Sequence, residues 1–470
     1  MLVTPDPTAV PTALSPVCPA YGAHTDARRI YGPEAQEKAT ELHEALRAAH
    51  GGVAPVLVHG DVPAWLVLGY REVLEVARNP TRFSRDSRLW RAPAEGLVAP
   101  DNPLLPLTTW VPMCSFVEGA EHTRLRAAVT DTMKQLNHRG VRRYIVRYAD
   151  LLISGFRERG EADLVKEFAD ALPMLVMTKL LGMADSYGPR LLEAARDMIK
   201  ATETAIESNA FVEQALADLV AEKKERPGED FATWLIAHGS ALTDAELVQH
   251  LRLVLIAAYS TTANLIASTL HMTLTDSRFR GNLAGGHMTL PDALEQVLWD
   301  TPPFSAVYGR WATADTELAG HHIKAGDMLV LGLAAGNADP QVRPDLTVPV
   351  HGNRSHLAFS GGPHECPGQD IGRAIAEVGV DTLLTRLPDV SLAVPAEDIR
   401  WQTSLLSREL LELPVTFTAL RTDRATASTP PATAPAPSLL APAAEAAAVP
   451  TPPKSRSRLW ESLVRWVRGM

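Results

Sequence analysis

The sequence has few cysteines, no excess of basic charge and no long apolar run, and each absence excludes a class of protein. Only three cysteines, Cys18, Cys114 and Cys366, occur in 470 residues, and they are widely separated. This spacing fits neither a disulfide framework nor a zinc site built from Cys-x-x-Cys pairs. It predicts a protein of a reducing, cytoplasmic compartment.

The chain carries a net charge of −10, and no basic block interleaved with aromatic residues occurs before residue 450. Nucleic-acid binding therefore has little electrostatic basis. No run of roughly 20 apolar residues occurs, which argues against an ordinary membrane span. Residues 1–22 lack a basic start and are interrupted by prolines, so they do not resemble a signal peptide.

The composition predicts a globular protein with additional segments at both ends. With 46% hydrophobic and 21% charged residues, the chain can bury a large core. We expect a Pro-rich lead (1–32), a globular domain (33–421), a disordered Ala/Pro-rich linker (422–453) and a basic amphipathic helix (454–470). This last helix is suited to an anionic membrane surface or a membrane-bound partner, which would make the protein peripheral to the membrane. A solvated tail is the alternative.

Hydrophobic periodicity within the globular domain predicts a mainly helical protein with small, segregated β-sheets. A turn at Gly60 and Asp61 separates two short strands, and Pro291 suits the first turn of a helix. The expected helices lie over 33–48, in several pieces over 121–274, over 291–299 and from just after Cys366 to about 387; the expected strands lie over 55–68, 310–317 and 323–333.

The segment with the clearest chemistry is residues 359–373 (FSGGPHECPGQDIGR). Gly361 and Gly362 allow a tight turn that can approach a flat ligand, and Pro367 suits the start of a helix just after Cys366. Free N–H groups at that helix start favour a thiolate over a thiol, and the thiolate is the form that binds a metal.

The residues alone leave two other readings of Cys366 open. One is a structural cysteine buried at a helix start. The other is a zinc ligand that acts together with His351, His356 and His364, although the spacing of these four fits no familiar finger or ribbon.

The same segment resembles the cytochrome P450 superfamily, whose Phe-x-x-Gly-x-x-x-Cys-x-Gly motif is matched at Phe359, Gly362, Cys366 and Gly368. The resemblance covers about 33–418. It implies a cytochrome P450 fold that holds haem b between a central helix and the helix after the cysteine loop, with Cys366 as the iron ligand. Thiolate ligation favours O–O cleavage, so the resemblance implies a haem-thiolate monooxygenase.

Four further residues match the family's contacts with the haem propionates. His122 and Arg126 are four residues apart and share one helix face, a geometry suited to a carboxylate. A solvated basic helix face is the alternative for this pair. By the same resemblance, Arg310 and His364 take the same role.

Residues 253–264 resemble the family's central helix over the haem, with ordinary core packing as the alternative. Thr261 falls on the threonine that helps to protonate bound oxygen, while Ser260 replaces the usual acid and Ala258 the usual glycine. Thr261 and Ser260 are therefore the candidate catalytic residues. A hydroxyl relays a proton but holds no charge in reserve, so Ser260 predicts less efficient oxygen activation.

The largest departure from the family is at its Glu-x-x-Arg motif, because Glu295 is followed three residues later by Leu298. A leucine cannot supply the missing charge. We predict that Arg354, which lies before the cysteine loop, pairs with Glu295 directly. Some actinomycete P450s lack the same arginine, and the chain resembles that subgroup.

The resemblance implies insertion of one oxygen atom from O₂ into a small organic substrate. No flavin or reductase motif is present, so we expect electrons from a ferredoxin and a ferredoxin reductase. The alternative is a haem-bearing regulatory or scaffold protein with little oxygenase activity, which Leu298, Ser260 and the basic C-terminal segment favour.

Overall fold

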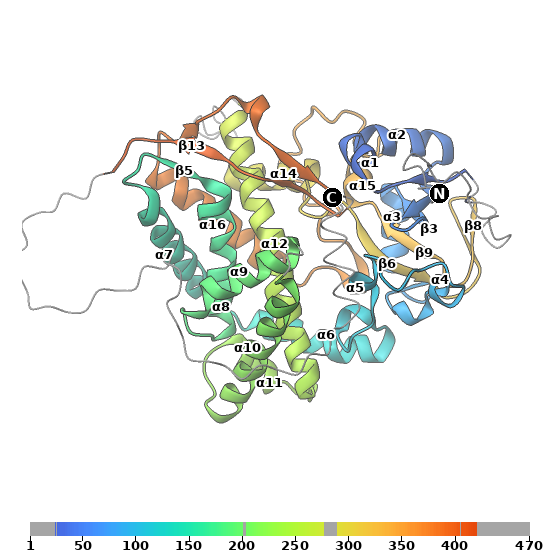
Figure 1. Cartoon of the computed structure of the whole chain (residues 1–470), viewed down its shortest axis with the longest axis horizontal. Helices are drawn as coiled ribbons and strands as arrows, with labels where there is room; N and C mark the ends of the chain where they lie inside the picture. The colour runs from blue at the N-terminus through green and yellow to red at the C-terminus, as the bar shows by residue number, and fades with distance from the viewer. Residues whose placement is uncertain (1–23, 25, 201–203, 277–288, 405, 421–470) are drawn as a thin grey trace, which may run out of the picture.

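The computed structural model describes residues 24, 26–200, 204–276, 289–404 and 406–420 (Figure 1). Most of the predicted Pro-rich lead, the whole of the predicted linker and the predicted C-terminal amphipathic helix lie outside these residues. Within them, helices gather in one half of the molecule and the main sheet in the other half. This arrangement confirms the predicted fold class, mainly α with segregated β-sheets.

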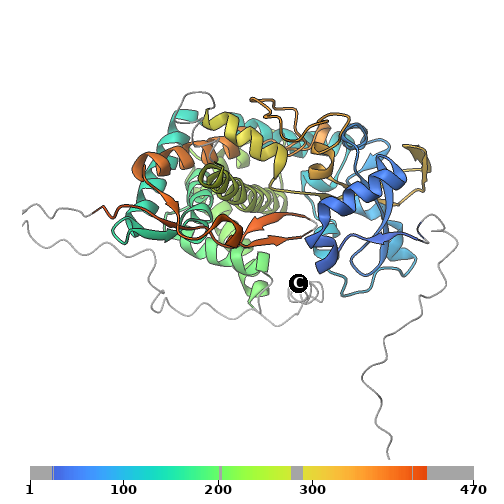
Figure 2. The same cartoon turned by 90° about the horizontal axis from the view of Figure 1, so that it is seen from above.

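The helical half is built around one long central helix, α12 (Asp244–Thr275). Figure 2 looks nearly along it and shows the other helices around it. Helices α8, α10, α14 and α16 all contact it. The other helices of this half are α6 (Gly119–Lys134), α7 (His138–Phe156), α8 (Ala171–Leu181), α9 (Tyr187–Lys200), α10 (Ala205–Glu225), α11 (Phe231–Ile236), α14 (Leu290–Asp300) and α16 (Gln369–Arg386).

Two of these helices begin with a capping box, which satisfies N–H groups that the first turn leaves free. In α12 the Thr243 hydroxyl accepts from the Glu246 amide, and the Glu246 carboxylate accepts from the Thr243 amide. Thr289 and Asp292 do the same in α14, with Pro291 in the first turn as predicted. Local sequence therefore sets where both helices start.

Helix α12 is the one helix in the described part of the chain that is long and apolar enough to cross a membrane. However, 67% of its most apolar window is buried inside the protein. A core helix of a large domain has the same length and composition, and the contacts of α12 with its neighbours are those of a core helix.

The main sheet has six strands in the order β1-β2-β3-β9-β6-β4. Its β2–β3 hairpin confirms the two predicted strands, and Gly60 and Asp61 both adopt positive φ, 79° and 57°. These two residues and His59 form a three-residue loop between the paired residues Val58 and Val62, a common length for a hairpin connection. The strands are β1 (Arg28–Arg29), β2 (Val53–Val58), β3 (Val62–Val67), β9 (Met328–Leu331), β6 (Val307–Ala312) and β4 (Phe83–Ser84).

Further helices and strands complete the described fold. The single helix predicted over 33–48 is interrupted at Lys38, whose φ of −113° and ψ of 33° leave the helical region. The remaining helices are α1 (Pro33–Glu37), α2 (Ala39–His50), α3 (Tyr70–Arg78), α4 (Arg91–Ala94), α5 (Leu105–Thr108) and α15 (Leu333–Asn337), and the remaining strands are β5 (Glu161–Asp163), β7 (Thr316–Leu318), β8 (His321–Ile323), β10 (Ser391–Leu392), β11 (Trp401–Thr403), β12 (Arg408–Leu410) and β13 (Pro414–Thr416).

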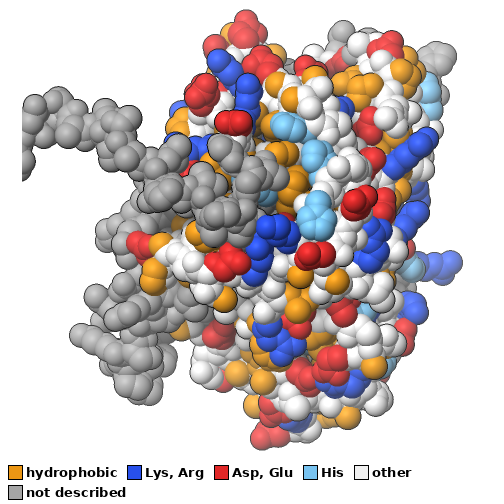
Figure 3. All heavy atoms as spheres, turned by 90° about the vertical axis from the view of Figure 1, so that its right-hand side faces the viewer, with side chains coloured by type: hydrophobic (Ala, Val, Ile, Leu, Met, Phe, Trp, Pro, Cys, Tyr) orange, Lys and Arg blue, Asp and Glu red, His pale blue; other side chains and the backbone are white. Residues whose placement is uncertain are grey.

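Each half has its own apolar core. The larger core joins α7, α8, α10, α12 and α16, while two smaller cores cover the two faces of the main sheet. On the face that Figure 3 shows, basic and acidic side chains of the described residues are interspersed. On that face no block of one charge is seen among the described side chains.

Candidate functional site

Cys366 lies in a tight loop that leads into α16. Gly362 turns the chain with φ of 71°, and the Cys366 amide donates to the Phe359 carbonyl at 3.0 Å. Gly368 caps the helix, and a Cβ at that position would lie 4.0 Å from the Cys366 sulfur. The predicted loop and helix start are therefore both present, with the sulfur at the N-terminal end of α16.

The electrostatics at the sulfur have two opposing parts. Burial raises the pKa of the Cys366 thiol, while the Gly368 amide and the positive charge of Arg126 lower it. In the protein by itself burial dominates, and the pKa of the thiol is raised above its usual value. The predicted effect of the helix start acts in the expected direction, and a bound metal would add the charge that removes the proton.

The four predicted propionate contacts come together beside this loop, although they lie on three separate segments, α6, β6 and the cysteine loop itself. The rings of His122 and His364 are 4.2 Å apart between centroids. Arg126, one turn after His122 on α6, donates to the carbonyl of Glu365 in the cysteine loop. Arg310 lies on β6, and its side chain is buried at 3% exposure.

Several nitrogen atoms of this cluster are buried without an acceptor. Among the described residues, His122 Nε2 and the Nε and Nη1 atoms of Arg310 have no hydrogen-bond partner. His364 differs, because its Nε2 lies 3.0 Å from a carboxylate oxygen of Glu118. Burial and, to a smaller extent, the positive charge of Arg85 lower the pKa of Arg310 to about 9. Buried cationic donors without an acceptor destabilise a fold, so this cluster is arranged for an anion.

Helix α12 contacts α16, the helix that follows Cys366, and has an open face of its own. Ala257 is exposed and Thr261, one turn further on, is half-buried, whereas Leu255 and Thr262 on the other faces are buried. The Thr261 hydroxyl donates to the Ala257 carbonyl at 2.5 Å. Its proton is thus engaged, and its oxygen remains able to accept a hydrogen bond. Ser260 is also half-buried.

These features pass a test for haem. The orphaned donors of His122 and Arg310 suit the carboxylates of haem, and the open face of α12 carries the small side chains of Ala257 and Thr261. A thiolate from Cys366 is a haem-iron ligand. The residues that the sequence singled out therefore fit the group that the resemblance implied.

The zinc alternative finds no such support. His356 bonds to Glu295 and His364 to Glu118, while His351 is exposed. The described residues contain no group of three or more His, Cys, Asp or Glu side chains that could hold a metal.

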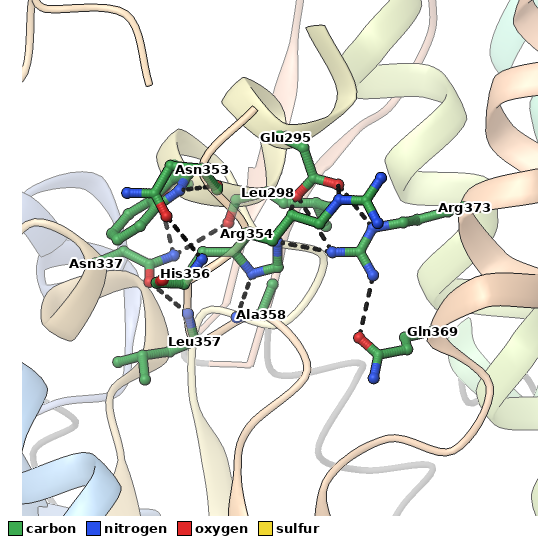
Figure 4. Close-up of polar contacts among 12 residues, drawn as sticks. Glu295, Leu298, Asn337, Asn353, Arg354, His356, Leu357, Ala358, Gln369 and Arg373 are labelled. Atoms are coloured by element: carbon green, nitrogen blue, oxygen red, sulfur yellow. Dashed lines mark hydrogen bonds and ion pairs between the residues drawn. The ribbon is translucent and has the colours of Figure 1, made fainter. Parts of the chain in front are cut away.

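The predicted pair of Glu295 and Arg354 is present, but it is peripheral. The Arg354 Nε lies 3.4 Å from a Glu295 oxygen, and its side chain is 64% exposed. The buried partners are Arg373, at 2.7 and 3.2 Å, and His356, at 2.9 Å (Figure 4). Sequence reasoning missed the role of Arg373. A signal was available, since Arg373 lies one turn into α16 among apolar residues, and a buried arginine needs an internal partner.

Leu298, where the family has arginine, is fully buried. Its side chain belongs to the large helical core, and its carbonyl accepts from the side-chain amide of Asn337 at 3.0 Å. Position 298 is therefore a packing position in this protein.

No family model matches the chain, but comparisons with individual proteins do. The vitamin D(3) 25-hydroxylase of Pseudonocardia autotrophica is 31% identical over 375 residues, which is 76% of this chain and 89% of the relative. Nocardicin C N-oxygenase of Nocardia uniformis subsp. tsuyamanensis is 29% identical over 84% of this chain and 99% of the relative.

Solved structures agree with these relatives. CYP154C4 from Streptomyces sp. W2061 matches with a TM-score of 0.71 and 30% identity, over 80% of this chain and 95% of that one. The myxobacterial cytochrome P450 CYP267B1, solved with myristic acid, matches with a TM-score of 0.73 and 28% identity, over 83% of this chain and 98% of that one.

With the fold, the cysteine loop and these relatives in agreement, the chain belongs to the cytochrome P450 superfamily. Its relatives are bacterial P450 oxygenases and hydroxylases, several of them from actinomycetes, and the protein is a cytochrome P450 monooxygenase of this bacterial type.

Proposed function

We propose that the protein binds haem b and inserts one oxygen atom from O₂ into a small organic molecule, with electrons from a ferredoxin. The observation that carries this proposal is the buried set of unpartnered donors on His122 and Arg310 beside the Cys366 loop. An apolar or mixed substrate is supported by the relatives, whose names include a vitamin D(3) hydroxylase and a complex with myristic acid.

Each site residue has a stated part in this proposal. Cys366 supplies the sulfur ligand, and a thiolate-bound haem supplies the capacity to cleave the O–O bond. The propionate carboxylates are held by His122, Arg126, Arg310 and His364. Phe359, Gly362 and Gly368 shape the loop that presents the sulfur.

Proton delivery falls to α12. Because the Thr261 hydroxyl donates to the Ala257 carbonyl, its oxygen accepts a hydrogen bond on the open side of the helix. It can thus orient a proton donor there. Ser260 is the adjacent relay group, and as a hydroxyl it passes protons on without the reserve of charge that a carboxylate holds.

Electrons must come from another protein, which we place on the side of the molecule where Cys366 meets α16. A groove lies there between α6, α7 and α16. Its lining is mostly apolar, with His138 and Arg142 as basic residues and Glu377 as the acidic one. Basic groups around an apolar centre suit an acidic ferredoxin.

The test is the absorption spectrum of the reduced carbon monoxide complex. Purified protein should show the red-shifted Soret band of thiolate ligation, and the Cys366→Ala variant should lack it. Ferredoxin-driven turnover of ligands from a compound screen then tests the oxygenase step. An unchanged band in Cys366→Ala would refute the ligand assignment.

A haem-bearing regulatory protein with little oxygenase activity is the second candidate, and Leu298 and Ser260 favour it. The two candidates differ in one measurement. Product formed with ferredoxin or peroxide from a bound ligand supports the oxygenase, whereas tight ligand binding without product supports the regulatory protein.

Our proposal for residues 454–470, a helix that docks on an anionic membrane or a membrane-bound partner, concerns a segment outside the described residues. Co-sedimentation with anionic liposomes, compared between the full chain and a version ending at Arg421, tests it. Equal pelleting would exclude the membrane form of this proposal.

A further inference from the structure

We propose that Arg373 replaces the arginine that is missing at position 298 and that it positions the Cys366 loop by holding Glu295 from α16. This inference rests on the proposed haem binding. It assigns a positioning role to a residue that sequence reasoning did not single out.

The carboxylate of Glu295 is buried, since this residue is only 2% exposed. An ionised carboxylate in such a place requires a buried counter-charge. Arg373 provides it in a two-point contact, with Nε 2.7 Å from Oε1 and Nη2 3.2 Å from Oε2. This fork geometry is the strongest form of an arginine–carboxylate pair.

His356 is the other buried partner of Glu295. The Ala358 amide donates to His356 Nδ1 at 3.2 Å, so that nitrogen carries no proton. The proton lies on Nε2, which donates to Glu295 Oε2 at 2.9 Å. In this arrangement His356 acts as a hydrogen-bond donor to Glu295.

Two arginines, Arg354 and Arg373, reach Glu295, and they differ in burial. Arg354 is 64% exposed, and water screens its charge. The side chain of Arg373 is only 10% exposed. Arg373 is thus the buried cation that balances the charge of Glu295.

Arg373 also contacts both sides of the loop that carries the Cys366 sulfur. The Arg373 guanidinium lies over the ring of Phe359, 4.6 Å from its centroid, and also donates to Gln369 Oε1 at 3.1 Å. The backbone carbonyl of Phe359 in turn accepts a hydrogen bond from the amide of Cys366. Arg373 therefore contacts the loop on one side of the cysteine and the helix on the other.

The ion pair of Glu295 and Arg373 joins two helices, whereas the family's pair lies within one. In a Glu-x-x-Arg arrangement both charges lie on one helix, on adjacent turns of the same face. Here Glu295 is on α14 and Arg373 is on α16, 78 residues later. The pair therefore fastens α14 directly to the helix that follows the cysteine (Figure 4).

The test uses Arg373→Leu, the conservative Arg373→Lys and the matched control Arg386→Leu. Arg386 lies on the same helix and has an ion pair with Asp150, but its side chain is 50% exposed. The readouts are the fraction of the reduced carbon monoxide complex with the thiolate Soret band and the rate of haem loss to apomyoglobin.

We expect Arg373→Leu to lose haem at least about tenfold faster than the parent and to lose most of the thiolate band, because a buried charge is left alone. Arg373→Lys should recover part of the band, and Arg386→Leu should match the parent. Arg373→Leu behaving like Arg386→Leu would overturn the inference.

A double variant shows whether Arg373 acts through Glu295. Arg373→Leu combined with Glu295→Gln removes both charges, so it should retain more haem and more thiolate band than Arg373→Leu alone. A double variant no better than the single one would overturn the inference.

The same variants separate this inference from the proposed function. If the parent lacks the thiolate band, the proposed haem function fails, and denaturant unfolding of Arg373→Leu, Glu295→Gln and their double variant then measures the ion pair by itself. Additive effects of the two substitutions on unfolding would overturn the pair as well.

Discussion

Replacement of Gly362 by alanine is the most direct test of the cysteine loop, because the neighbouring glycine provides a control. Gly362 has φ of 71°, and a Cβ there would lie 2.4 Å from the Ala77 carbonyl oxygen and 2.9 Å from the Arg78 Cα. Gly361 has φ of −165°, an ordinary extended conformation. A Cβ there meets only the flexible side chain of Leu74, at 3.2 Å.

The magnitude follows from these distances. A left-handed conformation costs an alanine roughly 1–2 kcal/mol, and the overlap with backbone atoms adds about 1–3 kcal/mol, since α3 must shift. We expect Gly362→Ala to lower the free energy of unfolding by about 3 kcal/mol. Gly361→Ala should cost less than about 1 kcal/mol, because the alanine also restricts the unfolded chain.

The assay is urea unfolding followed by circular dichroism, together with the haem content of each purified variant. Gly362→Ala should also hold less haem, because the loop that it distorts carries Cys366. If the two variants unfold within about 1 kcal/mol of each other, the backbone strain assigned to Gly362 is wrong.

Three further expectations concern single side chains. Ser260→Asp should raise the coupling of electron use to product, and Thr261→Ala should increase peroxide release; parent-like coupling in both variants would remove α12 from proton delivery. Arg354→Leu should lower stability by less than about 1 kcal/mol, since its side chain is 64% exposed, and a larger loss in urea unfolding would show a buried role. Burial raises the pKa of Glu295, but hydrogen bonds from its partners outweigh burial and hold it below the ordinary 4.5. Its contribution to stability is therefore complete above about that pH and is lost as the pH falls through the lowered pKa. Glu295→Gln should weaken the dependence of the free energy of unfolding on pH below about 4.5. An unchanged dependence in this variant would show that Glu295 does not cause it.

Local signals in the sequence were sufficient for much of the fold. Gly60 and Asp61 predicted a hairpin, because glycine and aspartate between two apolar segments favour a tight turn. Pro291 predicted a helix start at the position where α14 begins. These features depend on neighbours within a few residues, so a single sequence carries them.

The cysteine loop was predictable for the same reason. Two glycines, a cysteine and a helix start within ten residues define the position of the sulfur, whatever surrounds them. The resemblance to cytochromes P450 rested on this loop, and the relatives confirm the family.

The tertiary structure alone decided which distant groups share a buried space. The sequence shows that Glu295 lacks its usual partner, and Arg354 was the arginine expected to replace it. The buried partner is Arg373, 78 residues away along the chain, while Arg354 stays in contact with water. Burial sets the energy of an unpaired charge, and burial depends on how α14 and α16 pack against each other. Periodicity does not encode that packing, so the sequence identified the charges and only the tertiary structure paired them.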